Sequence, residues 1–193
     1  MRKDRLLAFS DGVFAIIITI MVLELKVPHE SSLDALFKVG PVFLSYVLSF
    51  IYVAIYWNNH HHMLELVQRI SGASLWANMF LLFWLSLVPF TTGWMGETQF
   101  ATWPTALYGL TLLMPAISYT ILQRALIAAH PSNARLGEAL GQDAKGKISL
   151  LLYAVGVGLA FYNTWFALAL FAAVALIWLV PDPRIERIVA KEE

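Results

Sequence analysis

The sequence has 193 residues, of which 59% are hydrophobic and only 13% are charged, and its formal net charge is zero at pH 7. A soluble domain is roughly 45–50% apolar and about 25% charged, so the composition excludes an ordinary soluble protein and predicts an all-α protein that resides in membrane lipid. The balanced charge indicates no nucleic-acid partner, and the absence of cysteine excludes disulfides and thiolate chemistry.

Six segments have the apolar character of membrane-spanning helices, which need about 20 residues each. In chain order the expected spans are Leu6–Val27, Val39–His62, Ser74–Trp94, Trp103–Ala128, Lys147–Tyr162 and Thr164–Val180. The last two are shorter than the others and form a tight hairpin that is divided at Asn163. The sequence therefore predicts a polytopic membrane protein with a single six-helix transmembrane domain over residues 1–183 and a short polar tail over residues 184–193.

The distribution of basic residues predicts how these spans are oriented, because cytoplasmic loops carry an excess of Lys and Arg. With six spans, 11 of the 13 Lys and Arg residues lie on the side of the two termini, and only Lys26 and Lys38 lie opposite. Both termini are therefore expected in the cytoplasm. The outer loops carry four acids, Glu24, Glu30, Asp34 and Glu97. These acids form either a mouth that attracts cations or ordinary solvated loops.

The first span differs from the others because it carries polar residues within an apolar helix, namely Ser10, Asp11, Gly12, Thr19 and Glu24. A carboxylate inside a span costs a few kcal/mol by insertion scales, so other polar groups must offset that cost. Asp11 lies six residues beyond Arg5, about 9 Å above the expected cytoplasmic entrance at 1.5 Å per residue.

Polar residues of the second and third spans fall at the same depth as Asp11. A hydrogen-bonded network at this depth would hold the first helix in place. Its expected members are Arg5, Ser10, Asp11, His60, His61, Trp76 and Asn78. Which histidine binds Asp11 is open, and a proton-relay or catalytic role for Asp11 is the alternative. His61 and Glu65 have a weak zinc-like spacing, but no HExxH motif or cysteine accompanies them, so no metal site is expected.

A second group of residues shares the opposite face of the first span at 100° per residue. These residues are Phe9, Gly12, Ile16, Thr19, Ile20 and Leu23. A stripe of this kind lines a pore in a channel but packs in the core of most other helices. The residue pattern alone does not choose between these two interpretations.

Several motifs in the first half of the chain resemble those of a known family. Arg5, Phe9, Ser10 and Asp11 follow an RxxxFSD pattern that leads into Gly12-Val-Phe-Ala-Ile-Ile-Ile-Thr-Ile. Tyr56-Trp-Asn-Asn-His-His, Trp76-Ala-Asn and Pro89-Phe-Thr follow in the next two spans. Together they resemble the first three helices of prokaryotic members of the transmembrane protein 175 family, the family of the lysosomal potassium channel. From Trp94 onward the resemblance is confined to the number and length of the spans.

This resemblance implies a potassium channel in the inner membrane of a prokaryote. One six-helix repeat implies a homotetramer whose pore is lined by the first helices, without the TVGYG filter of ordinary potassium channels. The hydrophobic constriction maps onto Ile16, followed by Ile20 and Leu23, and a threonine layer maps onto Thr19. The FSD network maps onto Arg5, Ser10 and Asp11. Ile20 stands where many relatives have leucine.

The channel interpretation implies K⁺ as the permeant ion and no cofactor. Two rival functions remain open on the residues. One is a proton- or cation-coupled secondary transporter that uses Asp11 and a histidine as a relay. The other is an intramembrane enzyme built on His61, Glu65 and Asp11, which is not expected because no nucleophile lies beside a base.

Overall fold

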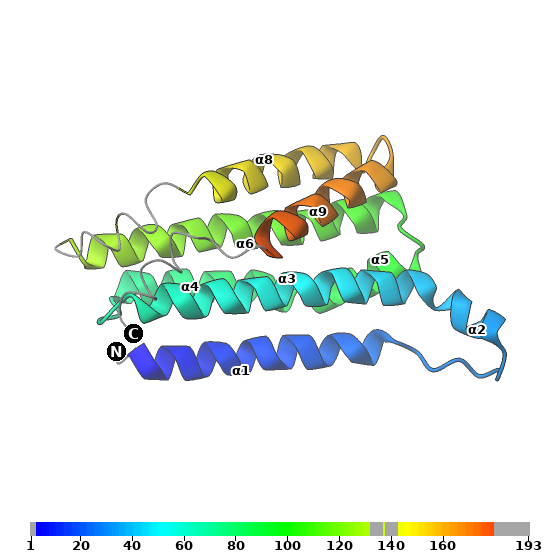
Figure 1. Ribbon diagram of the computed structural model, residues 1–193, viewed down its shortest axis with the longest axis horizontal. Helices are drawn as coiled ribbons and strands as arrows, with labels where there is room; N and C mark the ends of the chain where they lie inside the picture. Colours follow the sequence, from blue (N-terminus) through cyan, green and yellow to red (C-terminus); the bar gives the residue numbers. More distant parts are fainter. Residues whose placement is uncertain (1–2, 132–136, 138–142, 180–193) are drawn as a thin grey trace.

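The computed structural model describes residues 3–131, 137 and 143–179, and these residues form a bundle of long helices without β-strands. In chain order the elements are α1 (Lys3–Met21), the 3₁₀ turn η1 (Val22–Glu24), α2 (Leu33–Lys38), α3 (Gly40–Glu65), α4 (Gly72–Ser86), α5 (Val88–Glu97), α6 (Thr102–Ala129), α8 (Ala144–Leu159) and α9 (Thr164–Leu179). The long helices run side by side, and the short α2 extends beyond one end of the bundle (Figure 1).

Length and composition identify four stretches that can cross a membrane, which are Lys3–Glu24, Gly40–Glu65, Gly72–Glu97 and Thr102–Ala129. Helices α8 and α9 have 16 residues each, about 24 Å at 1.5 Å per residue. They form a hairpin that packs on α6 and, through α9, on α3. Six helical segments therefore lie alongside one another, and the prediction of an all-α polytopic membrane protein is confirmed.

The third span, expected over Ser74–Trp94 with Pro89 near its far end, is interrupted at Leu87. Helix α4 ends at Ser86 and α5 begins at Val88, with Leu87 between them. Pro89 has no backbone N–H and therefore cannot bond to the carbonyl oxygen of Leu85, as a continuous helix would require. The break divides the span into an α4 part that packs mainly on α6 and an α5 part that packs mainly on α3.

Other boundaries also differ from the sequence-based expectation. Helix α8 begins three residues earlier than predicted, because the Asp143 side chain caps it by accepting a hydrogen bond from the Gly146 backbone N–H at 2.7 Å. The α-helical part of the first span ends at Met21. The expected tail over residues 184–193 and most of the loop between α6 and α8 lie outside the described residues.

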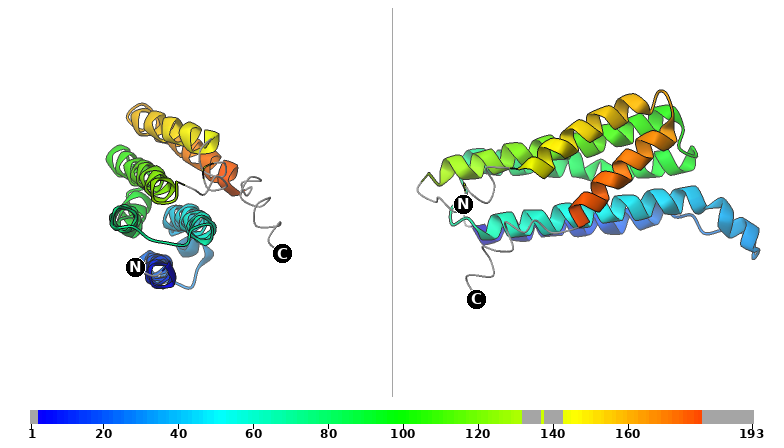
Figure 2. Two further views of the ribbon diagram at one scale, coloured as in Figure 1. Left: turned by 90° about the vertical axis from the view of Figure 1, so that its left-hand side faces the viewer. Right: turned by 45° about the horizontal axis from the view of Figure 1, so that its top comes forward.

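Helix α1 lies at the edge of the bundle, on the side away from the α8–α9 hairpin (Figure 2). Within the chain it packs on α3, α4 and α5. Its buried side chains belong to the same core as residues of α3, α4 and α6. A helix at an edge has one face covered by its own chain and another face left for lipid, for a pore or for another copy.

Candidate functional site

The two faces of α1 differ sharply in how much of each side chain is exposed. The buried face consists of Leu6, Ser10, Phe14, Ile17 and Met21. The opposite face carries the predicted stripe: Phe9, Gly12, Ile16, Thr19, Ile20 and Leu23 are all exposed. Ile16 is 58% exposed while its neighbour Ile17 is 3% exposed, so no residue in the described part of the chain covers the stripe.

A buried chain of hydrogen bonds joins α1 to α4 and α3. The Asn78 side-chain amide donates to Ser10 Oγ at 3.0 Å, and Asn78 Oδ1 lies 2.7 Å from His60 Nε2. All three side chains are fully buried. The His60 ring also contacts Phe14 with 5.5 Å between ring centroids. Three helices are thus linked by one amide, which pairs with the Ser10 hydroxyl and with one ring nitrogen of His60. The other ring nitrogen, His60 Nδ1, is buried and has no hydrogen-bond partner among the described residues.

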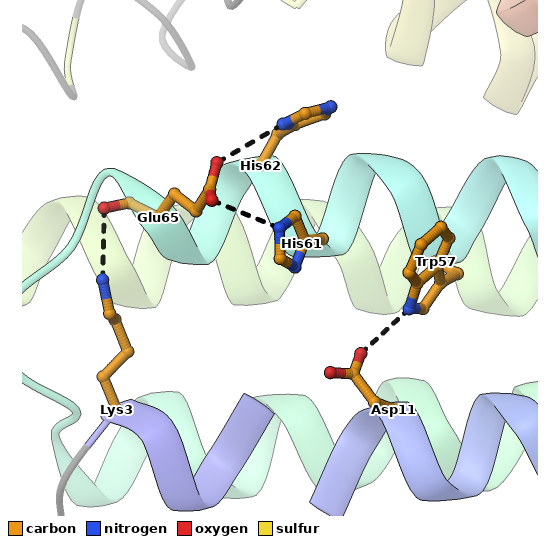
Figure 3. Close-up of polar contacts among 6 residues, drawn as sticks. All are labelled: Lys3, Asp11, Trp57, His61, His62 and Glu65. Atoms are coloured by element: carbon orange, nitrogen blue, oxygen red, sulfur yellow. Dashed lines mark hydrogen bonds and ion pairs between the residues drawn. The ribbon is translucent and has the colours of Figure 1, made fainter. Parts of the chain in front are cut away.

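Asp11 points toward α3 rather than toward α4. Its Oδ1 accepts a hydrogen bond from the indole Nε1–H of Trp57 at 2.9 Å, and Trp57 stacks on His61 with 6.0 Å between ring centroids (Figure 3). Ser10 and Asp11 are adjacent in sequence, about 100° apart on the helix, so they bind two different helices. The hydrogen-bond partner of Asp11 is therefore an indole, and not a histidine as expected from the sequence.

The end of α3 carries a second polar cluster, centred on Glu65. His61 Nε2 and His62 Nδ1 lie 3.2 and 3.5 Å from the two Glu65 carboxylate oxygens. The Lys3 ammonium donates to the Glu65 backbone carbonyl at 3.4 Å (Figure 3). This contact ties the beginning of α1 to the end of α3. No group of three or more possible metal ligands occurs within the described part of the chain.

Two predicted members of the network belong neither to the buried chain nor to the contacts of Asp11, Trp57 and His61. Arg5 and Trp76 are exposed side chains, Trp76 at 76%, and among the described residues neither reaches the Ser10–Asn78–His60 chain. Sequence reasoning did not assign a role to Trp57. One feature of the sequence could have indicated this role. A buried indole N–H usually finds a hydrogen-bond acceptor, and Trp57 lies at the depth where Asp11 needs a donor.

Thr19 presents its hydroxyl oxygen on the exposed face while its proton is engaged by the helix. The hydroxyl donates to the backbone carbonyls of Ala15 and Ile16, both at 3.0 Å. Its oxygen lone pairs remain available to a cation or to hydration water. Ile16 and Ile20 are one α-helical turn apart, but Leu23 lies in η1. A 3₁₀ turn has 3.0 residues per turn, so Leu23 departs from the α-helical register of the other two.

The far end of the first span is fastened to α5 by two contacts. Lys26 and Glu97 form a hydrogen-bonded ion pair, which raises the pKa of the Lys26 ammonium above its ordinary value. The Glu24 side chain lies against Gly93, where an added Cβ would come within 2.9 Å of Glu24 Oε2. The absence of a side chain at Gly93 is what allows this approach.

Comparisons with known proteins agree with the motifs and the geometry. A family model described as "Endosomal/lysosomal potassium channel TMEM175" matches residues 5–89. A potassium channel from Chryseobacterium sp. (strain P1-3) is 52% identical over 187 residues, which is 97% of each chain. A potassium channel from Streptomyces collinus is 30% identical over 91% of each chain.

A solved structure extends the similarity to nearly the whole fold. It is the crystal structure of a lysosomal potassium-selective channel TMEM175 homologue from Chamaesiphon minutus, with a TM-score of 0.81 and 29% identity. The match covers 92% of this chain and 96% of that one. The human endosomal/lysosomal proton channel TMEM175 is 36% identical over 83 residues, which is 37% of this chain and 16% of the human protein.

Proposed function

Because this chain belongs to the endosomal/lysosomal potassium channel TMEM175 family, we propose that it is a potassium-selective ion channel formed by a homotetramer. Four copies of α1 surround one axis and line the pore. The full-length bacterial relatives, which are named as potassium channels, support this assignment. Membership of a channel family also supports the assignment that this protein is not an enzyme, needs no cofactor and conducts K⁺.

The uncovered stripe of α1 is the observation that carries this proposal. In four copies, the Ile16 side chains form a ring that is narrow and apolar, and such constrictions can close a pore by dewetting. The Ile20 side chains form a second ring about one turn further along. Leu23, in the 3₁₀ turn, lines the wider outer part of the pore. Gly12, on the same face, has no side chain, so it leaves the pore wider below the constriction.

Thr19 supplies the oxygen atoms nearest to this constriction. Because the hydroxyl proton is shared between two backbone carbonyls, four hydroxyl oxygens point their lone pairs at the axis. Potassium holds its hydration water less tightly than sodium does, so it crosses an apolar ring beside such oxygens with the smaller penalty. The channel therefore prefers potassium weakly to moderately.

The polar groups behind the pore hold α1 in position and do not contact the permeating ion. Ser10, Asn78 and His60 hold the helix from one side, and Asp11 with Trp57 holds it from another. Arg5, His61 and Trp76 lie at the same end of the bundle. We propose that this side faces the cytoplasm of a prokaryotic cell, because the sequence assigns 11 of the 13 basic residues to the side of the two termini.

Recording from the purified protein in planar bilayers tests the proposal. With potassium on one side and sodium on the other, we expect single-channel steps and a reversal potential displaced toward that of potassium. Thr19→Val keeps the shape and removes the hydroxyl, so it should move the reversal potential toward that of sodium while the pore still conducts. If no unitary currents are recorded and the protein instead shows saturable uptake coupled to a counter-ion, the alternative of a proton- or cation-coupled secondary transporter is favoured.

Proton permeation is a second candidate activity, and the relatives favour it. The eukaryotic members that match parts of this chain are named as proton channels. A pH gradient without potassium, applied in the same bilayers, separates the two activities. A proton current in this chain that survives Thr19→Val would place proton and potassium selectivity on different residues.

A further inference from the structure

A cavity on the far side of the bundle from α1 has no role in the proposed pore. It is partly open to the surface of the bundle. Its walls come from α3, α6, α8 and α9, and α9 crosses the bundle obliquely there (Figure 2). Aromatic rings dominate these walls, namely Tyr52, Tyr56, Tyr119, Tyr153 and Trp178.

The polar atoms in these walls are largely engaged by the protein itself. Tyr52 donates to the Phe171 backbone carbonyl, and Tyr119 donates to that of Asn59 at 3.0 Å. Thr120 donates to its own helix, and the Trp178 indole donates to Ser149 Oγ at 2.8 Å. The cavity therefore offers mainly ring faces and aliphatic carbon, a surface that suits a hydrocarbon chain better than a polar metabolite.

The cavity lies near the boundary of the bilayer core. Ring contacts of Phe100 with Trp165 and of Trp103 with Phe161 align the α8–α9 turn with the beginning of α6. From that end α8 reaches only about 24 Å, whereas the 28 residues of α6 reach about 42 Å. The hydrocarbon core is about 30 Å thick, so the first turn of α8 falls near its far boundary.

Charged side chains gather at this boundary: three basic residues lie beside the cavity, and the carboxylate of Asp143, which caps α8, lies in its wall. The Lys145 ammonium lies 5.9 Å from the centre of the Trp178 ring and 3.5 Å from the Ile177 carbonyl oxygen. Arg124 follows the wall residue Thr120 by one helical turn on α6, and Lys147 is exposed in the first turn of α8. Basic pockets between transmembrane helices on the cytoplasmic side are typical sites for anionic lipid headgroups.

We propose that this cavity binds one acyl chain of an anionic membrane phospholipid, whose phosphate is bound by Lys145. The Lys145 ammonium can attract a phosphate oxygen beside the Ile177 carbonyl through its positive charge. The assignment of the inner leaflet as the source rests on the proposed orientation of the channel. The binding itself is measured without any ion current, so its failure and that of the channel proposal can be told apart.

The fluorescence of Trp178 reports directly on an occupant. The protein is reconstituted with phosphatidylglycerol that carries bromine on its acyl chains, and the signal of Trp178 is taken as the difference between the wild type and Trp178→Phe. We expect strong quenching of this difference signal. Ala116→Leu fills the cavity and should abolish most of the quenching, whereas Ala128→Leu, on an exposed position of the same helix, should leave it unchanged.

The headgroup contact is tested by a matched pair of charge changes. Lys145→Gln should weaken the apparent affinity for brominated phosphatidylglycerol roughly fivefold, which corresponds to about 1 kcal/mol for one basic residue near the membrane surface. Lys147→Gln removes the same charge two residues away, on a different face of α8, and should change the affinity much less.

Three outcomes would overturn the proposal. The first is Trp178 quenching in the wild type that equals that of Ala116→Leu. The second is equal loss of affinity in both lysine variants, which would mean general surface charge rather than a site. The third is quenching by brominated phosphatidylcholine, which has no net charge, that equals quenching by brominated phosphatidylglycerol. The site would then bind any lipid chain without selecting for an anionic headgroup.

Discussion

The two faces of α1 are similar in composition but different in what covers them. The face against the chain includes one polar residue, Ser10, which binds Asn78. The face away from the chain also carries one, Thr19, and it binds only its own helix. In lipid, apolar residues on either face are equally tolerated, so hydrogen bonds and close packing determine which face a helix turns inward. The polar positions therefore say more about the placement of α1 than the apolar ones do.

The largest expected difference between the faces is in packing. Phe14 is 1% exposed and Phe9 is 53% exposed, although both are phenylalanines on the same helix. Phe14→Ala should lower the free energy of unfolding by up to about 3–5 kcal/mol, the range for such truncations in cores. Phe9→Ala should cost much less. Thermal unfolding in detergent measures both, and equal losses would mean that α1 is rotated from its described position.

The next effect concerns the buried amide. Asn78→Leu has nearly the same shape but strands Ser10 and His60, at about 1–3 kcal/mol for each unpaired group. We expect lower yield and loss of the assembled oligomer on gel filtration. The triple replacement with Ser10→Ala and His60→Leu removes the stranded groups and should recover part of the loss. A triple variant that is no better than Asn78→Leu would indicate that packing, not hydrogen bonding, is what Asn78 provides.

A smaller effect is expected at the hydrogen bond between Trp57 and Asp11, which is partly exposed. Trp57→Phe keeps a ring against His61 and removes the N–H that donates a hydrogen bond to Asp11. A hydrogen bond to a charged group contributes about 1.5–3 kcal/mol, and this partly exposed one should contribute less. Asp11→Asn, which can still accept from the indole, should be milder than Asp11→Ala. If Asp11→Asn assembles normally yet selectively loses conduction, Asp11 is a relay and not a positioning residue.

The smallest effect is expected at the outer end, where the charges are exposed. The pKa of Lys26 is raised by its hydrogen bond to Glu97, so the pair stabilises the protein below the ordinary Lys pKa, and this contribution is lost as the pH rises through the higher folded-state value. Exposed pairs contribute little. Glu97→Gln should therefore leave the melting temperature near neutral pH almost unchanged and lower the Lys26 pKa, measured by NMR titration.

Hydropathy, the basic-residue distribution and the FSD motif were enough to predict an all-helical membrane protein and its family. The helix ends were less predictable. The break at Leu87 follows from Pro89, whose position within the span was visible, but the shift of α8 depends on a cap at Asp143. The 3₁₀ turn that carries Leu23 leaves no clear sign in the sequence.

The polar network was predicted by depth but not by direction. The sequence places Asp11, Trp57, His60 and Asn78 at one level of the membrane, yet the rotation of each helix about its axis decides which pairs form. That rotation results from the packing of several helices together. The cavity near Trp178 could not be predicted for the same reason, since four helices and an oblique crossing create it.

The conduction of two neighbouring variants tests the central claim most directly. Ile16 and Ile17 are adjacent isoleucines about 100° apart on α1, the first exposed and the second buried. Each is replaced by asparagine and recorded in bilayers with asymmetric potassium and sodium. We expect that Ile16→Asn assembles, hydrates the constriction, raises the unitary conductance and weakens the ion preference, whereas Ile17→Asn impairs folding because it buries an unpaired amide. If Ile16→Asn folds normally and leaves both conductance and ion preference unchanged, Ile16 does not face the pore and the placement of α1 is wrong.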